Sequence, residues 1–213
     1  MNIRTKEAVR YLGYGRHAID EPTLEMIRDS FQELEQIANG RFVYRIFEII
    51  ENNENKLTIG GLEIQSQNLC KNLKDCKQAI VFCATLGPSV DLLIKKYSIS
   101  DMSRAVVLQA CAAAFLEEYC DRVQKQIANE LEEGLYLRPR FSPGYGDFSI
   151  LHQQRLLQMT DASKKIGLAM TDGYMLTPSK SITAVMGISR GAGECIVQGC
   201  EACTKEDCIY RRS

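Results

Sequence analysis

Residues 101–131 read DMSRAVVLQACAAAFLEEYCDRVQKQIANEL, and this stretch decides the fold class. It contains no glycine or proline and is rich in Ala, Leu, Glu, Gln and Arg, which favour helices. Asp101 is a residue type that caps the first turn of a helix. We therefore predict one long helix over residues 101–131. Its run of small residues at 110–114 would allow another backbone to approach closely.

The segments before this helix alternate between helical and extended patterns. Helices are predicted where apolar residues recur every three or four positions and extended segments where aromatic and β-branched residues gather. The helical segments are residues 6–12, 20–37, 66–73 and 88–94. The extended segments are residues 41–50, 57–64 and 79–84. Strands and helices do not alternate regularly, which is typical of α+β proteins.

The segments after the long helix complete this prediction. Residues 135–146 read LYLRPRFSPGYG, and their prolines and glycines exclude a continuing helix or a central strand. A helix is expected over residues 150–159 and a strand over 181–189, while the glycines of residues 187–193 suggest a loop. The predicted fold class is α+β, with long helices packed on a twisted, mostly antiparallel sheet.

Composition and charge exclude several classes of partner. The 213 residues include 26 Lys and Arg against 27 Asp and Glu, a formal net charge of −1, so no basic footprint for nucleic acid is expected. No apolar run approaches the roughly 18 residues of a membrane span, and the N-terminus has no hydrophobic signal segment. We therefore expect a cytoplasmic protein that contacts neither nucleic acid nor membrane.

The nine cysteines fall into two groups. Five are scattered among apolar or helical residues and are expected to be buried. The other four are Cys195, Cys200, Cys203 and Cys208, so we divide the chain into a module at residues 1–190 and a cysteine-rich tail at 191–213. Four close thiolates could bind zinc or an iron–sulfur cluster. The spacing matches no standard ferredoxin, and redox thiols or unligated surface cysteines remain open alternatives.

The segment RFSPGYGD at residues 140–147 is the strongest candidate for a ligand site. The guanidinium of Arg140 can meet a carboxylate or phosphate with a fork of donors. The neighbouring glycines let a backbone approach a ligand without interference from side chains. A tight turn with a solvated arginine is the alternative, and physical reasoning from the composition does not decide between them.

Two motifs make the chain resemble the activation domain of cobalamin-dependent methionine synthase, which binds S-adenosylmethionine. Arg140, Gly144 and Tyr145 are similar to that family's Arg-x-x-x-Gly-Tyr signature. Residues 171–183, TDGYMLTPSKSIT, resemble its later Thr-Glu-Ser, Pro and Ser-Val-Ser segment. The motifs follow in the family's order, and the resemblance covers residues 100–190 best.

The resemblance implies a ligand and a role for each motif residue. Arg140 would hold the methionine carboxylate of S-adenosylmethionine, and Tyr145 would line the pocket. Ser142 and Gly144 would offer backbone groups to the adenosine end. The family places an acidic residue on the long helix to meet the ligand's amino group; Ala113 occupies that place here, so Glu117, one turn further on, is the candidate.

The resemblance also implies partners. The chain would be a stand-alone module for reductive remethylation of a corrinoid methyltransferase, with cobalamin carried on a separate chain because no Asp-x-His-x-x-Gly motif is present. An electron donor such as flavodoxin or ferredoxin would supply the electron. The alternative reading is an adaptor or electron-transfer protein whose cysteine tail binds a metal or an iron–sulfur cluster.

Overall fold

The computed structural model describes residues 2–14 and 19–190, and its centre is one antiparallel sheet. The strand order is β3-β2-β1-β4-β8-β5, and every neighbouring pair is antiparallel. A separate two-stranded ribbon joins β6 and β7. The strands are β1 (Arg41–Asn52), β2 (Lys56–Ile59), β3 (Leu62–Gln65), β4 (Gln78–Thr85), β5 (Leu135–Leu137), β6 (Ala169–Met170), β7 (Leu176–Thr177) and β8 (Ser181–Arg190).

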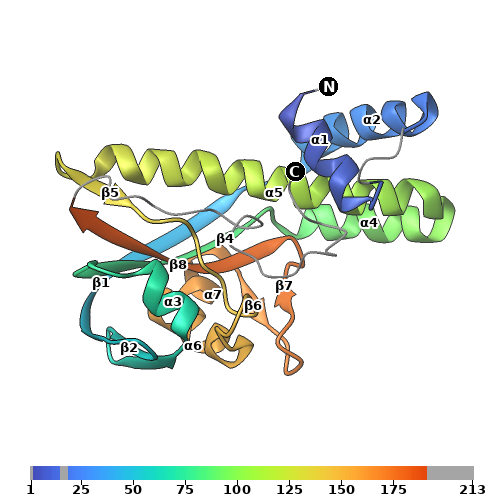
Figure 1. The fold of residues 1–213 in the computed structure, drawn as a ribbon. Coiled ribbons are helices and arrows are strands. Elements are labelled where there is room, and N and C mark those ends of the chain that lie inside the picture. The colour runs from blue at the N-terminus through green and yellow to red at the C-terminus, as the bar shows by residue number, and fades with distance from the viewer. Residues whose placement is uncertain (1, 15–18, 191–213) are drawn as a thin grey trace.

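One long helix, α5, crosses a face of this sheet and carries three further helices at one end (Figure 1). Its first turn begins as predicted, because Asp101 accepts a hydrogen bond from Arg104 N at 3.0 Å. The helices are α1 (Ile3–Tyr11), α2 (Glu21–Ile37), α3 (Gln67–Asn72), α4 (Pro88–Ser100), α5 (Met102–Glu130), α6 (Gln153–Thr160) and α7 (Ala162–Ile166), with a 3₁₀ turn at Ile150–His152.

The small residues of α5 allow the close packing that the sequence predicted. Ala110, Cys111 and Ala112 are buried, and the Cys111 thiol lies 3.9 Å from the backbone oxygen of Ile27 in α2. Helices α1, α2 and α4 all pack against α5. The first hundred residues therefore cover the helix that contributes the acidic candidate Glu117.

Alternate side chains of β4 point to opposite faces of the sheet and build two sides of the core. Ile80 and Phe82 join the cluster beneath α5. Val81 packs on the other face with side chains of α3 and α6, and Cys83 with side chains of α6 and α7. Burial on both faces explains why this strand has a continuous apolar sequence.

Two details of the strands differ from the prediction. The extended segment at 57–64 is a hairpin, because Gly60 and Gly61 both have positive φ and reverse the chain between β2 and β3. The strand predicted over residues 181–189 is present as β8 and contains Gly187, so the expected loop does not begin at that residue. A Cβ on Gly187 would lie 2.6 Å from the Cys76 sulfur, so the strand requires glycine there. Residues 191–193 lie outside the described residues.

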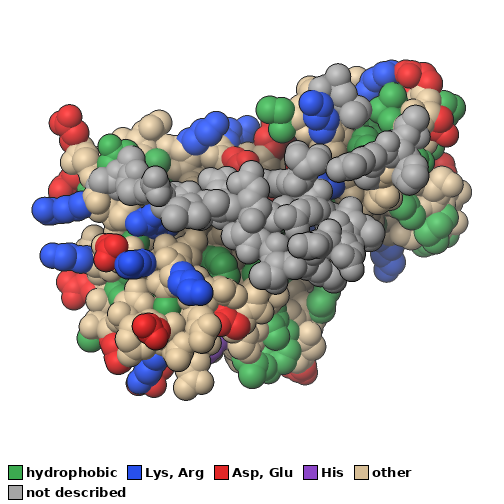
Figure 2. Space-filling view, in the orientation of Figure 1, with side chains coloured by type: hydrophobic (Ala, Val, Ile, Leu, Met, Phe, Trp, Pro, Cys, Tyr) green, Lys and Arg blue, Asp and Glu red, His purple; other side chains and the backbone are tan. Residues whose placement is uncertain are grey.

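The face of the molecule drawn in Figure 2 carries charges of both signs. Figure 2 shows Lys and Arg side chains interspersed with Asp and Glu on the visible face. This distribution agrees with the formal net charge of −1 and offers no basic stripe on that face. None of the helices in residues 2–14 and 19–190 is both long and apolar enough to span a membrane.

Candidate ligand-binding cleft

A cleft of about 220 Å³ opens between α5, the segment after Arg140 and the beginning of β8. Four parts of the chain meet there: the middle of α5, residues 142–145, the first residue of α6 and residues 176–183. The lining residues are Leu116, Glu117, Ser142, Pro143, Tyr145, Gln153, Leu176, Ser181, Ile182 and Thr183. Both motif segments therefore contribute residues to a single cavity.

The wall at residues 142–145 is a tight loop built on the edge of the sheet. Phe141 and Val185 exchange two backbone hydrogen bonds, both 2.9 Å, which fix the start of the loop to β8. Gly144 then adopts a φ of +91° and donates its N–H to Phe148 O at 2.7 Å. Such a φ suits glycine because it has no Cβ. The Pro-Gly corner thus presents Ser142 and Tyr145 to the cleft.

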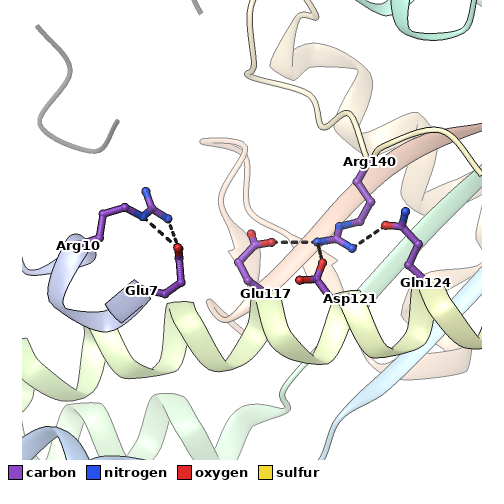
Figure 3. A network of polar contacts seen from close by, with 6 residues as sticks. All are labelled: Glu7, Arg10, Glu117, Asp121, Gln124 and Arg140. Carbon is purple, nitrogen blue, oxygen red and sulfur yellow. Dashed lines mark hydrogen bonds and ion pairs between the residues drawn. The ribbon is translucent and has the colours of Figure 1, made fainter. Parts of the chain in front are cut away.

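Arg140 points from the segment before this loop onto α5 and meets three acceptors there (Figure 3). Its guanidinium donates to Glu117 at 3.0 Å, to Asp121 at 2.7 Å and to Gln124 at 2.7 Å. The Arg140 side chain is only 12% exposed. Burial by itself lowers the pKa of Arg140, but the surrounding charges outweigh it and raise that pKa overall.

The network around Arg140 leaves an excess of negative charge beside the cleft. Two carboxylates, Glu117 and Asp121, face one guanidinium, and Glu117 also lines the cavity with 31% of its side chain exposed. Tyr11 of α1 lies close enough to feel this charge: its pKa is raised first by burial and then by Glu117. A cleft of this kind favours a ligand that carries a positive group.

The floor of the cleft contains polar groups that the sequence analysis did not single out. Gln153 is only 5% exposed, and its amide donates to Tyr174 O at 2.7 Å. The buried hydroxyl of Thr183 donates to the Gln153 side-chain oxygen at 3.4 Å. Gln153 begins a helix, and nothing in the sequence distinguishes it from an ordinary surface glutamine. Only the packing of α6 under the hairpin β6–β7 reveals its place.

Comparison with known proteins identifies the architecture. No protein-family model matches the sequence, and no curated protein matches it. A solved structure, the MetH reactivation domain bound to AdoHcy, matches with a TM-score of 0.60 at 13% sequence identity. The match covers 86% of this chain and 75% of that one. The fold is that of the MetH reactivation domain.

This match confirms the predicted class, a mixed fold of helices on an antiparallel sheet. Among the residues proposed from the resemblance to the MetH reactivation domain, Glu117, Ser142 and Tyr145 line the cleft. Gly144 shapes the same loop, and Arg140 contacts the cleft residue Glu117 rather than lining the cavity itself. The tail residues Cys195, Cys200, Cys203 and Cys208 lie outside the described residues.

Several large apolar side chains are exposed on the segments that contribute lining residues to the cleft. Tyr145 is 67% exposed although it lines the cavity, and further exposed apolar residues follow it in the chain or flank the lining residue Leu176. These residues, which we call the apolar rim, are Tyr145, Ile150, Leu151, Tyr174 and Met175. A group of exposed apolar side chains of this kind is typical of a surface that binds a partner.

Proposed function

We propose that this chain binds S-adenosylmethionine in the cleft and serves the reductive reactivation of a corrinoid methyltransferase, either cobalamin-dependent methionine synthase or a related enzyme, on a separate chain. One observation carries the proposal: Ser142 and Tyr145 of the first motif and Glu117, the acidic candidate on the long helix, line one cavity. The fold that forms this cavity is shared with a domain whose structure holds AdoHcy, the demethylated product of S-adenosylmethionine.

The charged groups at the cleft match the methionine end of this ligand. The carboxylate of Glu117 would pair with the ligand's ammonium group. The guanidinium of Arg140, which lies 3.0 Å from Glu117, would pair with the ligand's carboxylate. Arg140 would then exchange its exposed partner Asp121 for the ligand. The aromatic face of Tyr145 would lie beside the sulfonium, a contact that contributes roughly 0.5–2 kcal/mol.

The remaining polar groups suit the adenosine end. The backbone of Ser142 and Gly144 and the side chains of Thr183 and Gln153 offer donors and acceptors for a ribose or an adenine. The cavity of about 220 Å³ is smaller than the roughly 300–1,000 Å³ of ordinary ligand pockets. S-adenosylmethionine bound in this cavity would therefore keep part of its surface outside the protein.

This partial exposure suits a ligand that must meet a second protein. S-adenosylmethionine supplies a methyl group, and the acceptor would be cobalamin on the partner chain after one-electron reduction by a donor such as flavodoxin or ferredoxin in the cytoplasm. The apolar rim, with Tyr145, Leu151 and Met175 exposed, supports docking of that partner around the ligand. The contribution of this chain would be to bind and orient the sulfonium.

Calorimetric titration of S-adenosylmethionine into the wild-type chain and into Glu117→Gln tests the proposal. We expect saturable binding by the wild type and affinity at least about tenfold weaker in the variant, because it loses a charged partner of the ammonium group. The matched control is Glu133→Gln, which makes the same change of charge at an exposed position after α5.

The control variant should bind like the wild type, and circular dichroism should show that all three proteins fold. A wild-type chain that binds neither S-adenosylmethionine nor AdoHcy would contradict the proposal. Equal affinities in the wild type and in Glu117→Gln would place the ligand's amino group elsewhere.

A further inference from the structure

The carboxylate of Asp147 binds the beginning of α3 through three hydrogen bonds. It accepts from Ser66 Oγ at 2.5 Å, from Gln67 N at 2.7 Å and from Asn68 N at 3.2 Å. Ser66 also caps the helix, because its hydroxyl accepts from Leu69 N at 3.0 Å. Asp147 therefore satisfies backbone N–H groups that α3 cannot pair internally. Although burial opposes the charge, these bonds lower the pKa of Asp147.

This contact joins α3 to the loop that forms one wall of the cleft. Asp147 follows Tyr145 by two residues, and between them Gly146 passes directly against α3. A Cβ on Gly146 would lie 2.5 Å from the side-chain nitrogen Nδ2 of Asn68, and the φ of Gly146 is +55°. The loop is thus held at both ends: Phe141 is bonded to β8, and Asp147 is bonded to α3.

The span between these two anchors supplies Ser142, Pro143 and Tyr145 to the cleft. The bonds within this segment define its turn but do not connect it to α3: Tyr145 N donates to Ser142 O at 3.2 Å, Phe148 N to Tyr145 O at 3.0 Å and Gly144 N to Phe148 O at 2.7 Å. The charge-assisted bonds of Asp147 make that connection, and such bonds are about twice as strong as neutral ones.

We propose that Asp147 is a positioning residue for the ligand: it holds residues 142–145 in the conformation that forms the cleft wall. It is absent from the lining of the cavity, so it acts through the loop and not by contact with the ligand. This inference rests on the proposed function for its effect on affinity, whereas its effect on the loop can be measured without any ligand.

The test compares Asp147→Asn and Asp147→Glu with the wild type in two measurements. In Asp147→Asn an amide N–H₂ replaces one acceptor oxygen, so we expect amide hydrogen exchange across residues 142–148 to accelerate at least about tenfold while exchange in β4 stays unchanged. Affinity for AdoHcy should fall about tenfold, and Asp147→Glu, which keeps the carboxylate, should recover much of it.

The matched control is Asp75→Asn, which makes the same chemical change on an exposed turn where the positive φ of 63° tolerates asparagine. It should change neither measurement. Unchanged amide exchange of residues 142–148 in Asp147→Asn would overturn the inference. If the wild type binds AdoHcy, equal affinity in Asp147→Asn and in the wild type would overturn it too. A wild type that does not bind AdoHcy would instead contradict the proposed function, and the exchange data would still decide the role of Asp147.

Discussion

Arg140 combines two roles that sequence motifs alone cannot separate. Its place in the motif suggests a partner for a ligand carboxylate, whereas its guanidinium already meets Glu117, Asp121 and Gln124 on α5. The two carboxylates differ in environment, since the side chain of Glu117 is 31% exposed and that of Asp121 is 64% exposed. The more solvated pair with Asp121 is the one that we expect a ligand to displace, because solvent screens an exposed ion pair most.

Arg140→Ala should affect both ligand binding and stability. We expect affinity for S-adenosylmethionine to fall at least about tenfold, because the variant loses the carboxylate partner and the group that orients Glu117. The free energy of unfolding should fall by about 1–2 kcal/mol, because two partly exposed carboxylates remain without their cation. Calorimetry and urea denaturation measure the two effects.

Asp121→Asn separates the two roles of Arg140. If the guanidinium turns toward the ligand, removal of its exposed competitor should strengthen binding rather than weaken it. Weaker binding in Asp121→Asn would show that Arg140 acts only by holding Glu117 and the loop against α5.

At the scale of elements, local composition predicted the helices and strands whose formation depends mainly on the residues within them. Helix α5 followed from its lack of glycine and proline and from the cap at Asp101. The strand at 181–189 was predicted with Gly187 inside it, but the need for glycine at that position was not, because the reason is a tertiary contact with Cys76 and Leu73. The short helix α7 was also missed: five residues are too few for a periodic pattern to stand out.

The same limit applies to the cleft. The motif at 140–145 predicted Ser142 and Tyr145, and the family resemblance suggested Glu117 on the long helix; all three line the cleft. The direction of the Arg140 side chain and the participation of Gln153 depend on how α5 and α6 pack against the sheet. The sequence pattern of α5 or of α6 taken alone does not show how that helix packs against the sheet.

The buried thiols of β4 and α5 predict how stability depends on alkaline pH. Burial raises the pKa of Cys83 to about 11 and those of Cys111 and Cys120 to about 12, from an ordinary value of 9.0. The folded chain therefore retains protons that the unfolded chain loses above pH ~9. Stability from these groups is complete below pH ~9 and is lost as the pH rises toward their folded pKa values.

Urea denaturation between pH 7.5 and pH 10, under reducing conditions, would measure this loss. We expect the free energy of unfolding to decline above pH ~9, and Cys83→Ala to decline less steeply than the wild type because one such group is missing. Stability that rises over this interval would contradict the assignment of neutral, buried thiols.

At the scale of the whole molecule, the tail at residues 191–213 is the part whose chemistry rests on sequence alone. We predict that the purified full-length chain carries zinc or iron bound through Cys195, Cys200, Cys203 and Cys208. Elemental analysis and visible absorbance of protein purified without oxygen distinguish the two metals. The double variant Cys200→Ser/Cys203→Ser should lose the metal, whereas Cys70→Ala, on α3, should retain it.

A chain that contains neither metal, with all four tail thiols reactive under native conditions, would contradict that prediction. Ligand titration of the double variant adds a second result. Unchanged affinity for S-adenosylmethionine would show that the tail and the cleft work independently.

The position of α5 also determines where this chain can be cut or fused. Both motifs lie after residue 139, yet the helix that supplies Glu117 is covered by α1, α2 and α4, and β8 is paired with β4. A fragment that begins at α5 would expose Cys111 and Ala112 and leave β8 without that neighbour. Gene fusions, domain transplants and fragment libraries must therefore include the first hundred residues together with the motifs. Those residues contain no motif, but they support the helix and the strand on which the motif residues depend.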